Sequence, residues 1–341
     1  MNGRILITGT SGFVGHKIIE HFLNTTNLEI VGIERLNYAG NQQRVAEVVS
    51  DDKKHRYRSV HHDIRSEINQ QVCNKLGEFD YIVHVAASSH VDRSIEDPMS
   101  FVLDNVVATC NILNFARKQN SLKKFIYFST DEVFGPAPAG IEYDEYSRYN
   151  STNPYSATKA GGEELCVAFH NTYNIPIVIT HTMNVFGERQ HPEKFIPMCI
   201  SKISRGEKVY IHADSTCTIP GSRFYIHADD VADAIHYIIE NDPDPDQPGQ
   251  CPKFNIVGKE EMNNLELAKC IAESVGKPLI YEMVDFHSSR PGHDLRYALS
   301  GNRLRKAGWE PKTSIRDRIH EVVQWSLSNN RWLEKNKAKS S

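Results

Sequence analysis

Two groups of residues have the types and spacing that acid–base chemistry needs. In the first, Tyr155 and Lys159 stand four residues apart, which on a helix places them one above the other on the same face. A nearby ammonium favours a phenolate, so we expect Lys159 to lower the pKa of Tyr155 until its hydroxyl can accept a proton near neutral pH. The same pattern is common on surface helices, so its position after a strand of a nucleotide-binding fold is what makes it functional.

The second group is the run Thr130-Asp131-Glu132, which follows an apolar stretch that ends at Phe128. An ordinary turn or helix cap also uses consecutive polar residues. However, adjacent carboxyl groups in a partly dry cleft can hold different pKa values, so that one stays protonated as an acid while the other serves as a base. That division of roles suits the elimination of water.

A glycine-rich turn near the N-terminus predicts a dinucleotide site. Gly9, Gly12 and Gly15 have the spacing Gly-x-x-Gly-x-x-Gly between an apolar run and a helical pattern. Glycines there allow a tight turn, and the exposed N–H groups at the helix start bind a pyrophosphate. A bare glycine triplet is also found in simple turns, so the inference depends on the strand before it and the helix after it.

Glu34 lies at the end of the second apolar run, where a carboxylate accepts hydrogen bonds from the adenosine ribose and repels a 2′-phosphate. It therefore favours NAD over NADP, whereas the neighbouring Arg35 weakens that preference. The alternative for Glu34 is a solvated strand end. Asp63, after the third run, is expected near the adenine.

These residues require a parallel sheet to bring them together. The first half of the chain alternates β-rich runs with helical patterns, which predicts an α/β fold with a doubly wound, Rossmann-like sheet and ligands at the carboxyl ends of its strands. The expected strands are Arg4–Thr8, Glu29–Ile33, Arg56–His61, Asp80–His84, Lys124–Ser129 and Pro176–His181. The expected helices are Met99–Gln119, Asn153–Tyr173, Asp229–Asn241, Asn264–Val275 and Thr313–Asn329.

After about residue 186 this alternation weakens, and Pro192–Pro197, Asp214–Arg223 and Asp242–Pro252 have loop composition. We expect a smaller α/β lobe that binds the substrate. The predicted division is an NAD-binding domain at 1–185, to which 224–254 returns, a substrate lobe at 186–223 and 255–333, and a flexible tail at 334–341.

Composition excludes several classes of protein. The 341 residues carry a formal net charge of −4 and no long Lys/Arg run, so neither nucleic-acid nor membrane-surface binding is expected. Since there is no unbroken apolar stretch of about 18 residues and no signal-like start, we predict a cytoplasmic protein without a membrane-spanning helix. The seven cysteines are scattered without a Cys-x-x-Cys pair, and we expect reduced thiols and no metal site.

Together the motifs resemble the extended short-chain dehydrogenase/reductase superfamily, and within it the nucleotide-sugar 4,6-dehydratases. The likeness covers about residues 3 to 333. It is carried by Gly9–Gly15, Tyr38-Ala39-Gly40, Ser89–Ile95, Ser129–Val133, Asn153–Ala160, Pro192–Pro197 and Arg290–Tyr297. The resemblance implies NAD as a recycled cofactor and a nucleoside diphosphate hexose, dTDP- or UDP-glucose, as the substrate that loses water to give a 4-keto-6-deoxy sugar.

The resemblance also implies a role for each matching residue. Tyr155 takes the proton of the sugar 4-hydroxyl, Thr130 orients that hydroxyl, and Lys159 holds the nicotinamide ribose. Glu132 removes the C5 hydrogen, and Asp131 donates a proton to the departing 6-hydroxyl. The cofactor residues are Gly9, Ser11, Gly12, Phe13, Val14, Gly15, Glu34, Asp63, Ile64, Ala86, Tyr155 and Lys159, and the substrate residues are Ser89, His90, Asn184, Lys194, Arg223, Arg290 and His293.

The chain departs from the family pattern in the expected sugar region. Ser88 replaces a common Glu or Gln, Phe186 replaces a Tyr, Glu188-Arg189 replaces a Pro and the residue after it, and the loop between Ile211 and Arg223 is longer than usual. A UDP-GlcNAc 4,6- or 5,6-dehydratase, a 4-epimerase and a non-catalytic NAD-binding sensor therefore remain alternatives. The resemblance further implies a homodimer, in which helices at about 99–119 and 153–172 form a four-helix bundle.

Overall fold

A parallel sheet is the centre of the computed structural model, which describes residues 1–36, 40–241, 249–285 and 294–334. Within these residues the sheet has seven strands in the order β11-β6-β5-β4-β1-β2-β3, all paired in parallel. The order reverses beside β1, so the crevice for a ligand lies at the carboxyl ends near that point. The strands are β1 (Arg4–Thr8), β2 (Glu29–Glu34), β3 (Tyr57–His61), β4 (Tyr81–His84), β5 (Lys124–Thr130), β6 (Ile177–Thr182) and β11 (Lys253–Ile256).

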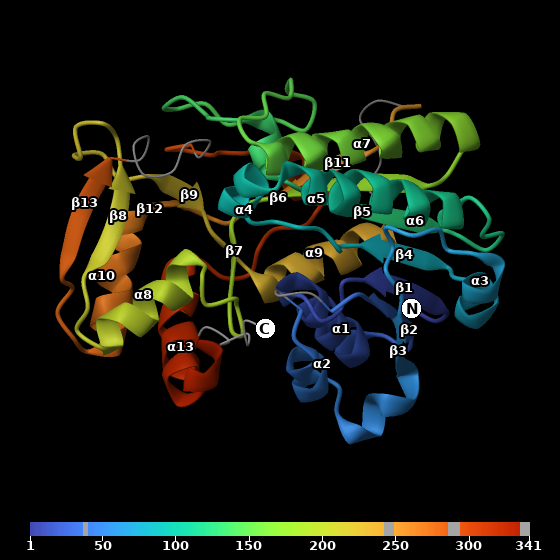
Figure 1. Cartoon of the computed structure of the whole chain (residues 1–341), viewed down its shortest axis with the longest axis horizontal. Helices are drawn as coiled ribbons and strands as arrows, with labels where there is room; N and C mark the ends of the chain where they lie inside the picture. The colour runs from blue at the N-terminus through green and yellow to red at the C-terminus, as the bar shows by residue number, and fades with distance from the viewer. Residues whose placement is uncertain (37–39, 242–248, 286–293, 335–341) are drawn as a thin grey trace.

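Helices cover both faces of this sheet (Figure 1). Because side chains alternate across a strand, Ile5 and Ile7 of β1 pack under one helical layer and Leu6 packs under the other. The first layer contains α1 (Phe13–Thr25), α2 (Gln42–Val48) and α9 (Ala228–Asn241). The second contains α3 (Gln70–Leu76), α5 (Pro98–Val102), the π-helical turn η2 (Leu103–Val107), α6 (Ala108–Ala116) and α7 (Pro154–Tyr173). The predicted doubly wound α/β fold is confirmed.

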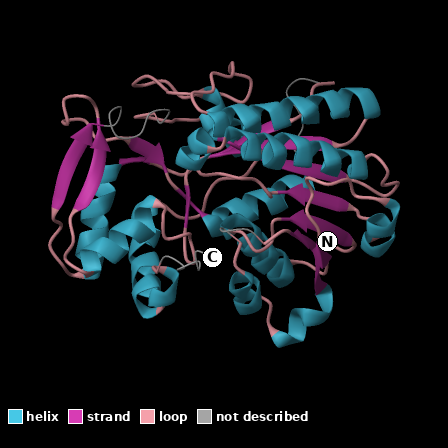
Figure 2. Cartoon of the chain, in the orientation of Figure 1, coloured by secondary structure: helices cyan, strands magenta, loops and turns pink. Residues whose placement is uncertain are grey.

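A smaller lobe of helices and short strands lies beside the sheet (Figure 2). It has a separate apolar core, which includes Ile200, Ile211, Ile271 and Val322. Two short strand pairs, β8–β13 in parallel and β9–β12 antiparallel, pack with three helices, and a parallel pair, β7–β10, lies beside them. After β10 the chain returns to the sheet through α9 and β11, and with β12 it enters the smaller lobe again. The elements are β7 (Val185–Phe186), α8 (Phe195–Ser204), β8 (Val209–Ala213), β9 (Ser222–Phe224), β10 (Ile226–His227), β12 (Glu261–Asn263), α10 (Asn264–Val275), β13 (Tyr281–Asp285) and α13 (Ile315–Ser328). The remaining short helices are η1 (Asp51–Arg56), α4 (Val91–Glu96), η3 (Asp131–Phe134), α12 (Asn302–Lys306) and η4 (Asn330–Trp332).

Several predicted boundaries are wrong. The segment Pro192–Pro197 is predicted to be a loop, yet α8 begins at Phe195, because proline is tolerated in the first turn of a helix. The expected helix at 99–119 begins at Pro98 and ends at Ala116, with a π-helical turn inside it. The seven-residue helices α2 and α3 are too short for their periodicity to be recognised. The predictions for Tyr38, Ala39, Arg290, His293, 242–248 and 335–341 lie outside the described residues.

The helical stretch Pro98–Ala116 bears on the expectation that the chain has no membrane-spanning helix. Of the described residues, it is the one stretch long and apolar enough to cross a membrane by length and composition, and 44% of its most apolar window is buried. Its inner side, with Ile112, Leu113 and Phe115, belongs to the core beneath the sheet. A search for unbroken apolar runs cannot find it, because its apolar residues are interrupted by polar ones that the helix directs elsewhere.

Candidate active site

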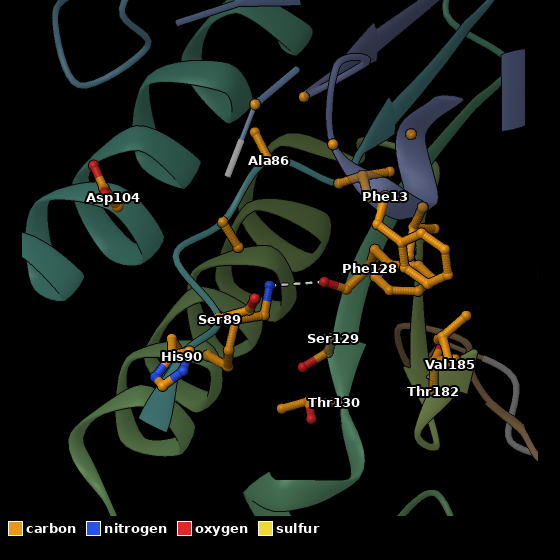
Figure 3. A pocket seen from close by; sticks show the side chains of 18 of the residues that line it. Phe13, Ala86, Ser89, His90, Asp104, Phe128, Ser129, Thr130, Thr182 and Val185 are labelled. Atoms are coloured by element: carbon orange, nitrogen blue, oxygen red, sulfur yellow. Dashed lines mark hydrogen bonds between the residues drawn. The ribbon is translucent and has the colours of Figure 1, made fainter. Parts of the chain in front are cut away.

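A cavity of about 330 Å³ opens at the carboxyl ends of the strands around β1 (Figure 3). This volume is in the range of small-molecule sites. Its walls come from the loops after β1, β2, β3, β4, β5 and β6 and from the start of α7. In Figure 3, Phe13 and Phe128 lie together on one side, while Ser129 and Thr130 project from β5 toward the side that holds Ser89 and His90.

The glycine-rich turn connects β1 to α1 and forms part of the cavity wall. Gly9 has a φ of +74°, and a Cβ there would lie 2.9 Å from Cα of Ala86. A Cβ on Gly15 would lie 2.2 Å from the carbonyl oxygen of Gly9. Larger residues therefore cannot occupy these positions without moving the backbone. Gly12 is the N-cap of α1, so the unpaired N–H groups of that helix face the cavity.

Glu34 is tied to this turn from the end of β2. Its carboxylate accepts hydrogen bonds from the Thr10 hydroxyl and from the Ser11 backbone N–H. Burial raises the pKa of Glu34, and these two hydrogen bonds oppose the shift. Ser11 itself is not part of the cavity wall, unlike the other residues predicted to bind the cofactor. Those that line it are Gly9, Gly12, Phe13, Val14, Gly15, Glu34, Asp63, Ile64, Ala86, Tyr155 and Lys159.

Tyr155 and Lys159 both reach the cavity from α7, but their relationship differs from the prediction. Lys159 Nζ donates to the Phe128 carbonyl oxygen at 2.7 Å, the dashed line of Figure 3, and lies 4.2 Å from the centroid of the Tyr127 ring. Burial, followed by the negative charge of Glu132, raises the pKa of Tyr155, and a hydrogen bond with Thr130 opposes this. The expected lowering of the Tyr155 pKa by Lys159 is therefore wrong for this arrangement. Burial lowers the pKa of Lys159 itself to about 8.

The two carboxyl groups after β5 share a buried corner of the cavity. Asp131 Oδ1 accepts the Thr130 hydroxyl at 3.0 Å, whereas Oδ2 is buried without a hydrogen-bond partner in the described part of the chain. Burial and then the charge of Glu132 raise the pKa of Asp131 to about 7, against the opposing charge of Arg223. Asp131 can thus be protonated near neutral pH, as an acid catalyst must be.

Glu132 has a more polar environment than Asp131. Burial raises its pKa, and the shift is opposed first by a hydrogen bond from Asn153 and then by the charges of Arg223 and Lys194. The amide Nδ2 of Asn153 donates to Glu132 Oε2 at 3.1 Å, which favours the carboxylate form that a base requires. The predicted difference between the two carboxyl groups is therefore present in their surroundings.

Asn153 is also the N-cap of α7, the helix that carries Tyr155. Its Oδ1 accepts the Ser156 N–H at 2.8 Å as the N-cap of α7, with Pro154 in the first turn. One side chain thus fixes the start of α7 and contacts Glu132. The cap could have been predicted from the Asn-Pro sequence before a helical pattern, but the contact with Glu132 depends on tertiary structure.

The predicted substrate residues divide into three groups. Ser89, His90, Asn184 and Lys194 line the same cavity as the catalytic candidates. Arg223 does not line it, because its guanidinium donates to the carbonyl oxygens of Ser222, Leu295 and Asp294. Its positive charge still acts on both carboxyl groups. Arg290 and His293 lie outside the described residues.

Arg44 is a cavity residue that the predictions from the sequence do not include. It is buried, and its guanidinium donates to the carbonyl oxygens of Ser11 and Arg189, both at 3.0 Å. It therefore links the glycine-rich turn with the segment that leads into the smaller lobe. No motif or spacing marks an arginine on a short helix for such a role.

The comparison with protein families decides the relationship. The model of the NAD dependent epimerase/dehydratase family matches residues 5–256. The chain belongs to this family. The resemblance predicted from the sequence motifs is thereby confirmed.

Individual family members match nearly the whole chain. The dTDP-glucose 4,6-dehydratase 1 of Escherichia coli strain K12 is 32% identical over 97% of this chain and 94% of its own length. The crystal structure of DesIV, a dTDP-glucose 4,6-dehydratase from Streptomyces venezuelae with NAD bound, has a TM-score of 0.85 and 32% identity, and covers 97% of this chain and 99% of that one. A UDP-glucose 4-epimerase from Thermus thermophilus shares the fold with a TM-score of 0.82 at 24% identity, covering 94% and 98%.

This family member should lose stability as Asp131 ionises. A folded-state pKa of about 7, above the ordinary value of 3.8, means that the contribution of Asp131 to stability is fully present below pH 4 and is lost as the pH rises to 7. The variant Asp131→Asn mimics the protonated acid at every pH. Its unfolding free energy, relative to the parent, should rise between pH 4 and 7 by up to about 1.4 kcal/mol per pH unit, then level off.

Urea unfolding of both proteins across pH 4 to 8 measures this difference. The matched control is Asp51→Asn, which changes a side chain that is 92% exposed and should give a difference that does not vary with pH. A flat difference for Asp131→Asn as well would show that Asp131 is ionised throughout this range.

Proposed function

We propose that this protein is an NAD-dependent nucleotide-sugar 4,6-dehydratase, which converts dTDP- or UDP-glucose to the 4-keto-6-deoxy sugar with loss of water. The observation that carries the proposal is one cavity that holds Tyr155, Thr130 and two unlike carboxyl groups, Asp131 and Glu132, beside a glycine-rich turn. The full-length similarity to dTDP-glucose 4,6-dehydratases supports the same reaction.

The residues around the glycine-rich turn fit the dinucleotide. The turn packs so closely that a Cβ at Gly9 or Gly15 would meet the backbone of Ala86 or Gly9, and the start of α1 offers N–H groups for a pyrophosphate. When bound, NAD would supply the acceptor for the hydride of C4 and the donor that returns it to C6. The residues proposed to hold it are Gly9, Ser11, Gly12, Phe13, Val14, Gly15, Glu34, Asp63, Ile64, Ala86, Tyr155 and Lys159.

Tyr155 is the proposed acceptor of the 4-hydroxyl proton, and Thr130, hydrogen-bonded with it, orients that hydroxyl. Since burial and the neighbouring carboxyl groups raise the pKa of Tyr155, this step needs either a cation nearby or fewer negative charges. Lys159, on the same helix, donates to the Phe128 carbonyl oxygen and does not lower the Tyr155 pKa in this arrangement. A proton on Asp131 removes one of the opposing charges, so the acid form of Asp131 assists both steps of the reaction.

The elimination follows from the new ketone at C4, which acidifies the C5 hydrogen. Glu132 takes this proton, and the electron pair released at C5 forms the C5–C6 double bond as the 6-hydroxyl leaves. Asp131 donates its proton to that hydroxyl, which departs as water. Glu132 then returns a proton to C5 when C6 is reduced. The proton that Tyr155 took from the 4-hydroxyl passes to Asp131, through Thr130, which is hydrogen-bonded with both, so every group regains its starting form and the net change is the loss of one water.

The smaller lobe, 186–223 and 255–333, is the proposed nucleotide-sugar lobe, next to a NAD-binding domain at 1–185 with 224–254. Lys194, the N-cap residue of α8, is proposed to neutralise the diphosphate, and Ser89, His90 and Asn184 to border the sugar. Arg223 is proposed to act through its charge on the carboxyl pair, while Arg290 and His293 are assigned to the substrate from the sequence motif alone.

We further propose a homodimer and a cytoplasmic location. The helical layer formed by α4, α5, η2, α6 and α7 carries exposed apolar side chains, including Ile95, Met99 and Leu103, with Met99 63% exposed. This row lies beside two long helical stretches, Pro98–Ala116 and α7, which run in the same direction because Ser94 contacts Tyr155 and Asn105 contacts Thr158. Such a surface suits a four-helix bundle with a second copy. The cytoplasmic location is supported by the supply of sugar nucleotides that the reaction needs.

The proposed reaction predicts a product lighter than the substrate by one water. Purified protein incubated with dTDP-glucose or UDP-glucose should give this product by mass spectrometry, and in D2O the product should carry deuterium at C5. Tyr155→Phe and Glu132→Gln should slow its formation by about 10²- to 10⁴-fold.

Tyr173→Phe, at the exposed end of the same helix, is the control and should keep full activity. A product of unchanged mass would identify an epimerase instead. The absence of any change in a panel of nucleotide hexoses would favour the non-catalytic alternative.

The contacts of Asn153 predict a separation of activity from stability. Asn153→Ser keeps a capping oxygen but cannot also reach Glu132, so kcat should fall about tenfold while the unfolding free energy changes by less than about 0.5 kcal/mol. Asn153→Ala should lose both, with a stability loss of about 1 kcal/mol. Asn263→Ala removes a similar cap from α10 and should lower stability without lowering kcat. Equal kcat values for Asn153→Ser and the parent would remove the role assigned to this contact.

The proposed dimer is tested by sedimentation or light scattering at micromolar concentration. The parent should have twice the 38.7 kDa mass of the chain, and Leu103→Glu should shift it toward the monomer, because a buried unpaired charge is costly at an apolar interface. Tyr281→Glu changes an exposed apolar side chain on the smaller lobe and should leave the dimer intact. A monomeric parent protein would refute the proposed assembly.

A further inference from the structure

An ion pair at the rim of the cavity involves Arg35, the residue that weakens the preference for NAD over NADP predicted from Glu34. Arg35 follows the proposed ribose ligand directly, and it faces Asp104 on η2. Its guanidinium pairs with both oxygens of that carboxylate, Nη1 at 3.0 Å from Oδ1 and Nη2 at 3.1 Å from Oδ2. Asp63 Oδ2 lies 3.5 Å from the same Nη1. Asp104 lies on a helix at the side of the cavity (Figure 3).

Asp104 is held in place by the loop after β4. Ser88 Oγ donates to Asp104 Oδ2 at 2.6 Å. Ser88 is itself fixed on both backbone groups by Asn105, whose Oδ1 accepts its N–H at 2.8 Å and whose Nδ2 donates to its carbonyl oxygen at 3.0 Å. The π-helical turn contains both acidic and amide residues, and such turns are frequent at functional sites. The carboxylate is therefore oriented before any ligand binds.

The charge at this rim bears on whether it binds an adenosine ribose with or without a 2′-phosphate. An arginine beside the ribose ligand is the usual partner of the 2′-phosphate of NADP, because its planar fork binds phosphate oxygens in pairs. Here Asp104 already occupies that fork in the same paired geometry. Two carboxylates, Asp63 and Asp104, pair with two guanidinium groups, Arg35 and Arg65, so the positive charges at this rim are already matched.

We propose that Asp104 is a specificity-determining residue that makes the protein select NAD over NADP by engaging Arg35. This inference rests on the proposed NAD site but not on the sugar chemistry. Asp104 lies 69 residues beyond Arg35 in the chain, so the selectivity is shared between the β2 end and the helical layer that covers the sheet. Without Asp104, Arg35 is available to a 2′-phosphate.

The test measures the binding of NAD⁺ and NADP⁺ to the nucleotide-free full chain by calorimetry. The parent should prefer NAD⁺, and Asp104→Asn should reduce the ratio of the two dissociation constants by about tenfold or more, because it removes a full charge next to Arg35. The double variant Arg35→Ala/Asp104→Asn should restore the parental preference, since the cation that gains the phosphate is then absent. Asp63→Asn should shift the ratio in the same direction by a smaller factor.

Glu96→Gln is the matched control, since it removes an exposed carboxylate that takes no part in these rim contacts, and it should leave the ratio unchanged. A ratio within twofold of the parent for both Asp104→Asn and Asp63→Asn, in variants with parental circular dichroism, overturns the inference while the proposed function stands. A gain of NADP⁺ binding that persists in the double variant also overturns it. Failure of the parent to bind either nucleotide contradicts the proposed function itself.

Discussion

The ionisation of two buried carboxyl groups constrains the whole site. Asp131 and Glu132 are adjacent in sequence, and both are removed from water, so a charge on one raises the cost of a charge on the other. What distinguishes them is their partners: Asp131 accepts a single hydroxyl, while Glu132 accepts an amide N–H and faces Lys194. This asymmetry separates the proposed acid from the proposed base, and the elements around the cavity preserve it.

Two layers of the fold preserve it together. β5 ends at Thr130, just before the carboxyl pair that lines the cavity. The N-cap of α7, Asn153, contacts Glu132 while it caps the helix carrying Tyr155. A shift of α7 along its axis would break the cap, move Tyr155 and release Glu132 at once. The acid–base groups are therefore coupled mechanically as well as electrostatically.

Much of this arrangement could be predicted from the sequence, because parallel strands end at one edge of a sheet and motifs that follow strands must meet there. The glycine-rich turn, Glu34, the Thr130–Glu132 run and the Tyr155–Lys159 pair all line the cavity for that reason. The direction of individual side chains was not predictable. Lys159 donates to a carbonyl oxygen of β5, and Arg223 donates to backbone carbonyl oxygens. Neither contact can be inferred from the spacing or the composition of the sequence.

The least predictable contacts join the cofactor rim to the helical layer. Asn105 contacts Ser88 on one side and donates to Thr158 Oγ1 of α7 at 3.0 Å on the other, so the same residue lies between the loop that holds Asp104 and the helix that carries Tyr155. Two hydrogen bonds of Asn105 therefore connect the cofactor rim to the start of α7. Departures from family pattern at the rim, such as Ser88, can therefore influence both cofactor choice and the placement of the proton acceptor.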